Sequence, residues 1–405
     1  MHWLKTFNRV AAGSLAILLT SCASIKAPKT LFITLGVGEE NFKDDSTQIR
    51  IVLNEYFERF KHSNPDTNIV YINYKIKNFY EQIERDNALN LGPDLVITDQ
   101  YGAKTLIARD LTTTLPNRQY FDDIYSPFVQ AEAKSKDEYT FALWLVSAQV
   151  ACFNNTTIKK APSTIEELEK ISASGKKIGL ASNAFELFWT AGAQGAVSEI
   201  SSLGKQMPTD PKYPGIHKWL QWLQQAALYR NIIFHDNQRD LGEKLKNKEL
   251  DWVTCDSYQI EGLKKSMGKS LGVSALPNGS TSKAIPTKVI FGFALGKNSS
   301  KTQRKMRMKF IRTTVNAIAL RKIQLDDKGF LAANQDVSIP PEISQIQSAI
   351  YRSYNEQRQS YSKEEPGIYR YWERHPQLGR ALGDLIDGSL DVDEALKILT
   401  TPQTN

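Results

Sequence analysis

Polar and aromatic side chains follow apolar runs at three places in the sequence, where they could bind a small molecule. Asp99-Gln100-Tyr101 follows the run Asp94–Thr98, Asp256-Ser257-Tyr258 follows a second run, and Glu39-Glu40 lies in the stretch after a third. Carboxylates and amides hydrogen-bond to hydroxyl groups, and aromatic faces cover the C–H faces of a ring. These residue types at these places predict a binding site for a small polar solute.

The predicted site combines these residues with further aromatic side chains. The candidate ligand contacts are Glu39, Glu40, Asp99, Gln100, Tyr101, Trp144, Phe185, Trp189, Asp256, Ser257, Tyr258 and Trp372. Asp99 is the strongest of them, because an acid at the end of an apolar strand has no evident packing role. Trp189, Trp219 and Trp222 also have a spacing typical of core residues, so for Trp189 that alternative stays open.

Motifs for catalysis lack the context that they need. Gly268-Lys269-Ser270-Leu271-Gly272 matches G-x-S-x-G, but a nucleophile elbow lies between a strand and a following helix. Here the sequence predicts a helix over Ile260–Ser266 and a strand over Leu271–Leu276, which is the reverse order. We expect no enzyme, and a hydrolase that uses Ser270 remains a rival hypothesis.

The histidines and cysteines do not form a metal site. His62, His217, His235 and His375 are scattered, and the sequence contains no C-x-x-C pair. We therefore expect no metal and no cofactor. Cys152 and Cys255 both follow predicted strands, so a disulfide is geometrically possible, but two buried free thiols are the expectation.

Five basic residues alternate with apolar ones along one predicted helix: Lys301, Arg304, Lys305, Arg307 and Lys309. No aromatic stacking residues are interleaved with them, so the pattern does not favour nucleic acid. A solvated face, or a patch near anionic lipid headgroups or a transporter, is the better interpretation.

Strands and helices alternate along the chain. Its 405 residues, 41% of them hydrophobic, predict a globular protein with two domains or one bilobed body. Strands are predicted at Leu31–Leu35, Asn68–Tyr74 and Asp94–Thr98, with helices between them. This order predicts an α/β fold with a parallel or mixed sheet covered by helices, whose ligands lie beyond the carboxyl ends of the strands.

The first 22 residues have the features of a bacterial lipoprotein signal. Lys5 and Arg9 precede the apolar run Val10–Leu19, which is too short to span a bilayer. Leu19-Thr20-Ser21-Cys22 resembles a lipobox, which makes Cys22 the lipidated residue and residues 23–30 a polar tether. Without Lys5 and Arg9, the 51 basic residues become 49 against 44 acidic ones, a net charge of +5.

Four stretches carry a family resemblance through their order and spacing: Gly92–Asp99, Phe153–Leu168, Trp189–Gly195 and Leu382–Leu396. Together they resemble the extracellular solute-binding proteins of ABC importers, the maltose-binding-like group with the type II periplasmic binding fold. Phe153 and Ile165 stand where that family usually has Tyr and Trp. The resemblance covers nearly all of residues 31–399.

The resemblance implies two lobes, each a mixed sheet flanked by helices, with a solute bound between them. The N-terminal lobe would comprise 31–142 and 288–331, and the C-terminal lobe 143–287 and 332–405. The expected protein is a monomer, lipid-anchored on the extracytoplasmic face of the cell membrane, that delivers its solute to ABC permease subunits and binds no nucleic acid.

The solute and the role each leave alternatives open. A sugar or oligosaccharide is preferred, although GVGEENFKDD lacks the tryptophan that many sugar binders of this group carry there. Glu39, Glu40, Asp99 and Asp256 could equally hold a polyamine or another cation. A sensor or scaffold lipoprotein without a transport role is the other alternative.

Overall fold

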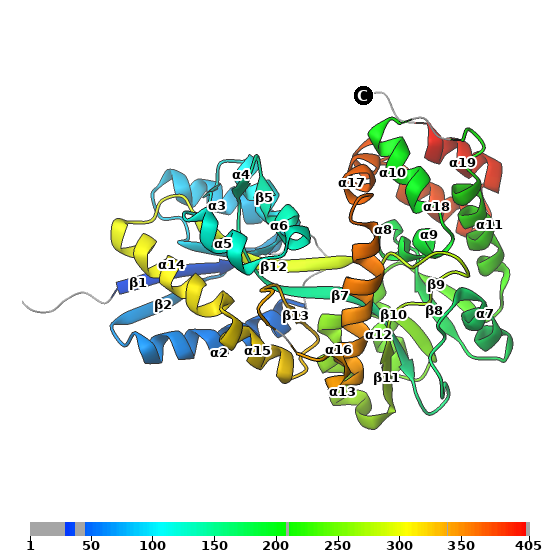
Figure 1. Cartoon of the computed structure of the whole chain (residues 1–405), viewed down its shortest axis with the longest axis horizontal. Helices are drawn as coiled ribbons and strands as arrows, with labels where there is room; N and C mark the ends of the chain where they lie inside the picture. Colours follow the sequence, from blue (N-terminus) through cyan, green and yellow to red (C-terminus); the bar gives the residue numbers. More distant parts are fainter. Residues whose placement is uncertain (1–28, 37–44, 208–209, 338, 402–405) are drawn as a thin grey trace, which may run out of the picture.

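The computed structural model describes residues 29–36, 45–207, 210–337 and 339–401. These residues form two lobes that lie side by side along the longest axis of the molecule (Figure 1). Each lobe contains part of a mixed sheet with helices packed on it, as predicted from the alternation of strands and helices. The lobe boundaries given above remain predictions.

The sheet of the first lobe is built from apolar strands in the order β2-β1-β3-β12-β7. β1 (Lys29–Leu35) pairs in parallel with β2 (Thr67–Ile72) and with β3 (Leu95–Asp99). All five residues of β3 are buried, which explains why its sequence is apolar without alternation. β12 (Lys288–Gly296) then adds an antiparallel neighbour to β3.

The sheet of the second lobe continues through β7 (Ala142–Asn154) in the order β7-β10-β8-β9. β10 (Trp252–Asp256) pairs antiparallel with β7 and in parallel with β8 (Ile178–Ala181), which pairs with β9 (Ile232–His235). β11 (Leu271–Ser274) pairs antiparallel with the other edge of β7. β7 is therefore the strand that the sheets of both lobes share.

A disulfide joins β7 and β10, and the expectation of two free thiols is wrong. Cys152 faces Val253 and Cys255 faces Val150, so the two cysteines are diagonal neighbours on one face of the sheet. Their Cα atoms are 5.9 Å apart, within the range that a disulfide spans, and both side chains are fully buried. The pairing of the strands brings these residues together, which the spacing in the sequence does not reveal.

β7 and β12 run as an antiparallel pair from one lobe into the other (Figure 1). Lys288 pairs with Ala148 on the side of the second lobe, and Phe293 pairs with Ala142 inside the first. The register shifts between Phe291 and Gly292, and a Cβ atom at Gly292 would lie 2.3 Å from Ala142 O. A side chain at Gly292 would therefore push this crossing ribbon apart.

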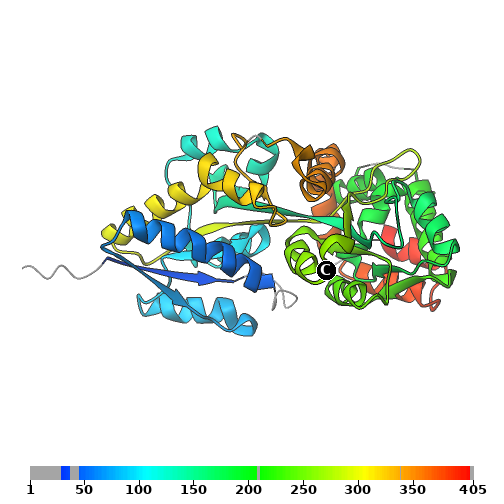
Figure 2. The same cartoon turned by 90° about the horizontal axis from the view of Figure 1, so that it is seen from below.

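Helices cover the faces of both sheets, and their polar sides face solvent. In the first lobe they are α2 (Asp45–Ser63), α3 (Phe79–Ala88), α4 (Gln100–Ala108), α5 (Arg118–Ile124), α6 (Pro127–Ala133), α14 (Lys301–Val315) and α15 (Ala317–Leu325). In and beside the second lobe they are α7 (Ile165–Ala173), α8 (Ala184–Leu187), α9 (Trp189–Ala193), α10 (Val197–Lys205), α11 (Pro214–Leu228), α12 (Gln238–Lys246), α13 (Ile260–Met267), α16 (Gln345–Tyr351), α17 (Glu365–Arg374), α18 (Leu378–Ile386) and α19 (Val392–Thr400). Figure 2 shows α16 and the segment after it lying between the lobes.

Two apolar cores hold the molecule together. One extends through the first lobe and onto β10 and α12, through residues such as Trp144, Phe293 and Val253. The other lies in the second lobe around Trp189 and Trp219. The first core includes residues of both lobes, so it also supports the junction between them. Within the described residues, no helix is both long enough and apolar enough to cross a membrane.

Candidate functional site

An aromatic cluster connects the two lobes. Tyr101 on α4 and Phe185 on α8 meet edge to face, with ring centroids 6.3 Å apart. Phe185 in turn contacts Trp372 on α17 at 6.2 Å. Tyr101 and Phe185 keep 37% and 38% of their surface exposed, and Trp372 is half-buried. The structure thus brings together three of the predicted ligand contacts from three separate elements.

A helix N-cap positions both Tyr101 and Phe185. Asp99 is the N-cap of α4, and its Oδ1 accepts hydrogen bonds from the backbone N–H of Tyr101 at 2.9 Å and of Gly102 at 2.7 Å. Asn183 is the N-cap of α8, and its Oδ1 accepts from Phe185 N–H at 2.9 Å. Each aromatic residue is therefore the second residue of a capped helix that begins just after a strand.

This cap corrects the argument that favoured Asp99. The carboxylate is 3% exposed and has a local structural role, since it satisfies backbone donors at the start of α4. An acid at the end of an apolar strand therefore does have a reason to be there. Asp99 holds Tyr101 in place, and its own oxygen is engaged with backbone N–H groups.

Gln100 is also structural rather than a ligand contact. The side chain is fully buried, its Oε1 accepts from Ile290 N–H at 2.7 Å, and its Nε2 donates to Lys288 O at 3.3 Å. Both partners lie on β12, so Gln100 ties α4 to the crossing ribbon. The prediction of a ligand contact is wrong here because no surface of the side chain is open to a solute.

Ser257 and Tyr258, which follow β10, are likewise buried and hydrogen-bonded within the protein. Ser257 is fully buried, and its hydroxyl donates to Gly329 O at 2.6 Å and lies 2.9 Å from Ser147 Oγ. Tyr258 is 5% exposed and donates to Asp256 Oδ2 at 3.0 Å. These bonds join β10 to β7 and to the loop at Gly329, so the prediction that Ser257 and Tyr258 contact ligand is corrected.

Asp256 caps the short 3-10 helix that follows β10. Its side chain accepts from the backbone N–H of Gln259, and the Gln259 side chain accepts from Asp256 N–H at 3.1 Å. Burial raises the pKa of the Asp256 carboxyl, although its hydrogen bond from Tyr258 opposes that shift. A carboxyl group in this environment is a poor partner for a soluble cation.

Trp144 and Trp189 belong to the cores, and their placement in the site is wrong. Trp144 is fully buried against Tyr56 and Phe293, with ring centroids 5.5 and 5.3 Å apart. Trp189 is fully buried and lies 6.4 Å from Trp252. The helical spacing that left the core alternative open for Trp189 proves to be the informative signal. Glu39, Glu40 and the proposed lipidation residue Cys22 lie outside the described residues.

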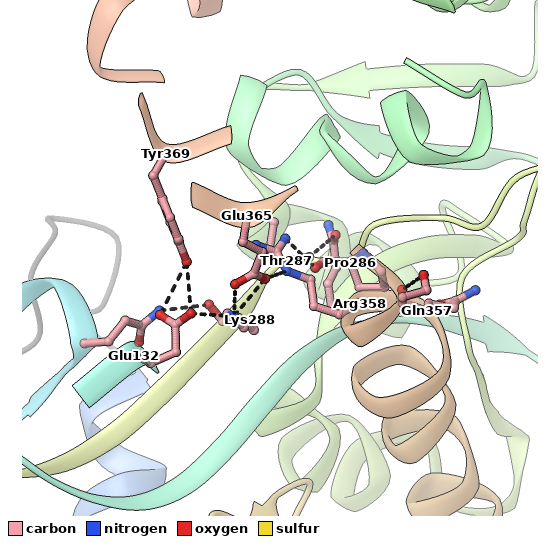
Figure 3. Close-up of polar contacts among 11 residues, drawn as sticks. Glu132, Pro286, Thr287, Lys288, Gln357, Arg358, Glu365 and Tyr369 are labelled. Atoms are coloured by element: carbon pink, nitrogen blue, oxygen red, sulfur yellow. Dashed lines mark hydrogen bonds and ion pairs between the residues drawn. The ribbon is translucent and has the colours of Figure 1, made fainter. Parts of the chain in front are cut away.

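A buried ion cluster joins β12, α6 and α17 (Figure 3). Lys288 Nζ, on the crossing strand β12, lies 2.9 Å from Glu132 Oε1 of α6 and 2.9 Å from Glu365 Oε1 of α17. Arg358 Nε donates to Glu365 Oε1 at 2.6 Å. All four side chains are at most 8% exposed. Two cations and two anions balance, as a buried cluster requires.

Two contacts extend this cluster to the surface between the lobes. The Tyr369 hydroxyl lies 3.4 and 3.5 Å from the two oxygens of Glu132, so α17 reaches α6 (Figure 3). Lys104 Nζ of α4 lies 5.4 Å from the centre of the Tyr369 ring, within the range of a cation–π contact. Tyr369 therefore contacts two helices of the first lobe while it belongs to α17.

Neighbouring charges set the pKa values of Glu365 and Arg358, and burial of the hydroxyl sets that of Tyr101. Burial alone opposes ionisation of Glu365, but Arg358 and Lys288 outweigh it and lower the pKa of the carboxyl to about 2. Burial lowers the pKa of the Arg358 guanidinium, yet Glu365 more than compensates and raises it. Desolvation of the hydroxyl raises the pKa of Tyr101 to about 12. At neutral pH Glu365 and Arg358 are therefore ionised, and the Tyr101 hydroxyl is neutral.

The sequence analysis missed the ion cluster and Tyr369. The members of the ion cluster lie at positions 132, 288, 358 and 365, too far apart in the sequence to form a motif. One feature of the sequence did indicate a buried ion pair. Lys288 is the first residue of the otherwise apolar strand Lys288–Gly296, and an unpaired cation there would be costly. The described residues contain no group of three or more His, Cys, Asp or Glu side chains that could hold a metal ion.

Ser270 does not lie in the setting of a nucleophile. Its hydroxyl donates to Met267 O at 2.6 Å, and the residue lies in a 3-10 helix between α13 and β11. The order of helix and then strand is the one predicted from the sequence, and it is the reverse of a nucleophile elbow.

Comparison with known proteins shows the fold. No family model and no curated protein sequence matches the chain. Among solved structures, the GacH receptor of Streptomyces glaucescens, solved unliganded and with acarbose, matches with a TM-score of 0.68 and 12% identity over 92% of this chain and 97% of its own. An ABC transporter solute-binding protein from Thermotoga lettingae, bound with α-D-tagatose, matches with a TM-score of 0.68 and 13% identity over 92% and 98%.

A third match has the same extent. The maltose-binding periplasmic protein of Listeria monocytogenes, in complex with maltose, gives a TM-score of 0.64 and 15% identity over 93% of this chain and 98% of its own. These matches span nearly the whole of both chains, so the protein has the two-lobed fold of these binding proteins. At 12–15% identity they establish the fold alone.

Proposed function

We propose that the protein is an extracytoplasmic solute-binding protein that captures a sugar or oligosaccharide between its lobes and delivers it to an ABC-type permease. The observation that carries the proposal is the meeting of Tyr101 and Phe185 across the lobes, each on the first turn of a capped helix. Exposed aromatic faces that approach from opposite lobes are suited to the C–H faces of a sugar ring. The structural neighbours described above bind acarbose, tagatose and maltose.

A sugar is favoured over a polyamine because Asp99 and Asp256 cap helices. Asp99 accepts hydrogen bonds from the start of α4, and Asp256 caps a 3-10 helix in a setting that raises its pKa. Two of the four carboxylates that the cationic alternative invokes are thus engaged in local structure, and the other two, Glu39 and Glu40, lie outside the described residues. A lipid on Cys22 would hold the protein beside its permease.

Ligand titration tests the proposal. The purified protein is screened by thermal shift against mono- and oligosaccharides, polyamines, amino acids and oxyanions. A ligand at about 1,000 times its dissociation constant adds about 4 kcal/mol to stability. We expect sugars to stabilise the folded protein. Stabilisation by a polyamine alone would overturn the sugar assignment, and no response to any ligand would overturn solute capture.

Variants then locate the site. Tyr101→Ala and Phe185→Ala should each weaken sugar binding at least about tenfold, because each removes a ring whose burial against ligand is worth over 1 kcal/mol. Tyr351→Ala is the matched control, since Tyr351 is also 37% exposed but lies on α16. Equal affinity of all three variants would place the ligand elsewhere.

A further inference from the structure

One face of α14 carries five exposed cations. Lys301, Lys305, Lys309 and Arg312 are exposed and follow one another at intervals of three or four residues, and the exposed Arg304 lies three residues after Lys301, so all five share one side of the helix. We call them the α14 basic face. The opposite side of α14 is buried through Met306, Phe310 and Ile311. The helix contains no acidic residue at all, so nothing on it offsets the charge.

These cations lack the carboxylate partners that other lysines of the lobe have. Lys134 pairs with Asp122, and Lys297 pairs with Asp110. Within the described part of the chain, no residue of the α14 basic face forms an ion pair with a carboxylate. Lys309 donates to Asn64 Oδ1 at 2.6 Å, and the Arg312 guanidinium lies 5.1 Å from the Tyr120 ring centre.

The arrangement is unfavourable for the helix itself. Lys301 and Arg304 lie in the first turn, where the helix dipole favours anions over cations. Lys301 with Lys305, and Lys305 with Lys309, are like-charge pairs four residues apart, which repel each other. The few contacts of these side chains within the fold, among them the bond from Arg304 Nε to Ser299 O at 2.8 Å, leave their mutual repulsion without a compensating carboxylate, which points to a role outside the fold.

The helix α14 packs, through its buried side, next to the start of β1. Lys29, the first described residue of β1, pairs with Thr67, and the Thr67 hydroxyl contacts Met306 of α14 at 3.4 Å. Figures 1 and 2 show the start of β1 and α14 at the same end of the molecule. Seven residue steps separate Lys29 from Cys22, a span of at most about 25 Å when fully extended.

We propose that the α14 basic face rests on anionic lipid headgroups and orients the anchored protein on its membrane. The proposal rests on the lipid anchor of the proposed function, because the short tether keeps this end of the first lobe close to the bilayer. A 15-residue helix is about 22 Å long, so the whole face lies within reach of the surface. Lysine and arginine near an anionic membrane are attracted over about one Debye length.

Lysine acylation on vesicles tests this arrangement. The mature lipidated protein is inserted into vesicles of phosphatidylcholine alone or mixed with phosphatidylglycerol. It is labelled with a membrane-impermeant amine reagent and analysed by peptide mass spectrometry. Lys301, Lys305 and Lys309 should react about fivefold or more slowly on the anionic vesicles, the factor expected from one cation at such a surface. High salt should remove the difference.

Controls come from the far lobe. Lys170 on α7 and Lys218 on α11 are exposed and should react equally on both kinds of vesicle. Lys305→Glu combined with Lys309→Glu should abolish the protection of Lys301, and Lys170→Glu combined with Lys218→Glu should leave it intact. Unchanged sugar binding and thermal stability would show that both double variants are folded.

The outcomes separate the basic face from the anchor and from solute binding. Equal labelling of the α14 lysines on both vesicles, with the protein still anchored, would overturn the membrane role and leave a solvated face. Absence of lipid on Cys22, read by mass spectrometry, would overturn the anchor and with it the reach argument. Neither result would affect the solute titration, which tests the proposed function by itself.

Discussion

At the scale of single residues, side chains that hold backbone in place determine what the lobes present to each other. Asp99 and Asn183 each accept from the N–H of the aromatic residue two positions later, and so fix its direction. The sequence analysis predicted the same role, that of a ligand contact, for Tyr101, Phe185 and Asp99. Residue type alone does not distinguish an acid that binds ligand from one that caps a helix, since both are oxygen acceptors beside a strand end.

Substitution of Asp99 separates these two roles. Asp99→Ala should lower the free energy of unfolding by about 1 kcal/mol through loss of the cap, and should weaken ligand binding by releasing Tyr101. Asp99→Asn keeps an acceptor and should stay close to wild type in both measurements. Chemical denaturation and ligand titration give the two quantities. A large loss of affinity in Asp99→Asn with unchanged stability would show that the carboxylate charge contacts the ligand.

Glu365 predicts a dependence of stability on pH. Its pKa of about 2 in the folded protein lies below the usual unfolded value of about 4.3, so folding favours the ionised form. That stabilisation is complete above about pH 5 and is lost as the pH falls toward 2. Glu365→Gln should cost about 3–5 kcal/mol at neutral pH, because Lys288 and Arg358 lose a buried partner.

The measurement is denaturation of both proteins between pH 7 and pH 3. The gap between wild type and Glu365→Gln should narrow as the pH falls below about 5, because Glu365 then takes up a proton in the unfolded wild-type chain while it stays ionised in the folded one. Glu373→Gln, an exposed change on the same helix, serves as the control and should show no gap. A gap that stays constant with pH would contradict the assigned charge state of Glu365.

At the scale of elements, the sequence predicted the buried strands more accurately than the ends of the helices. Apolar runs mark β1, β3, β7, β10 and β12 because buried strands need continuous hydrophobic residues. The predicted helix with the basic residues is α14, which ends at Val315, and a second helix, α15, follows at Asn316, whose side chain accepts from Ala319 N–H at 3.0 Å. The apolar spacing continues across the break between them, so periodicity could not show it. The helices α5, α6 and α12 were missed, because each is too short to show a clear period.

The disulfide between β7 and β10 should contribute measurably to stability. It closes a loop across 103 residues of sequence, which in the chain-entropy account is worth up to about 4–5 kcal/mol, with 2–4 kcal/mol typical. Cys152→Ala with Cys255→Ala should lower the free energy of unfolding by that amount. Dithiothreitol should destabilise the wild type and leave the double variant unchanged. Two free thiols in the unreduced, denatured wild type would refute the bond.

At the scale of the whole molecule, the contacts between α17 and the first lobe bear on opening and closing. Tyr369 contacts Glu132 and Lys104, and Phe185 contacts Tyr101, while Lys288 lies on the crossing strand itself. In the proposed solute capture, a hinge motion that separates the lobes would break the contacts of Tyr369 with Glu132 and Lys104 and the contact of Phe185 with Tyr101. Lys288 would keep its place on the crossing strand. The balance between open and closed forms then depends on a few weak contacts, which a ligand that prefers the closed form can outweigh.

Tyr369→Phe should shift this balance toward open forms. Loss of the hydroxyl removes its contact with Glu132, worth about 1 kcal/mol, or about a fivefold change in the ratio of closed to open. Small-angle scattering should report a larger radius of gyration for the ligand-free variant, and the ligand affinity should fall by a similar factor. Tyr351→Phe, on an exposed tyrosine of α16, is the control. An unchanged scattering profile and affinity would show that Tyr369 does not affect closure.

The crossing ribbon also constrains the order in which the chain can fold during synthesis. β12 lies between β3 and β7 in the sheet of the first lobe, and Ile290 of β12 bonds to Gln100 across 190 residues of sequence. The first lobe is therefore completed only after most of the second has been made. Contacts of such high sequence separation form slowly. A nascent chain that ends before Lys288 would lack the strand that β3 needs on that side, so the sheet of the first lobe would stay incomplete until β12 has been made.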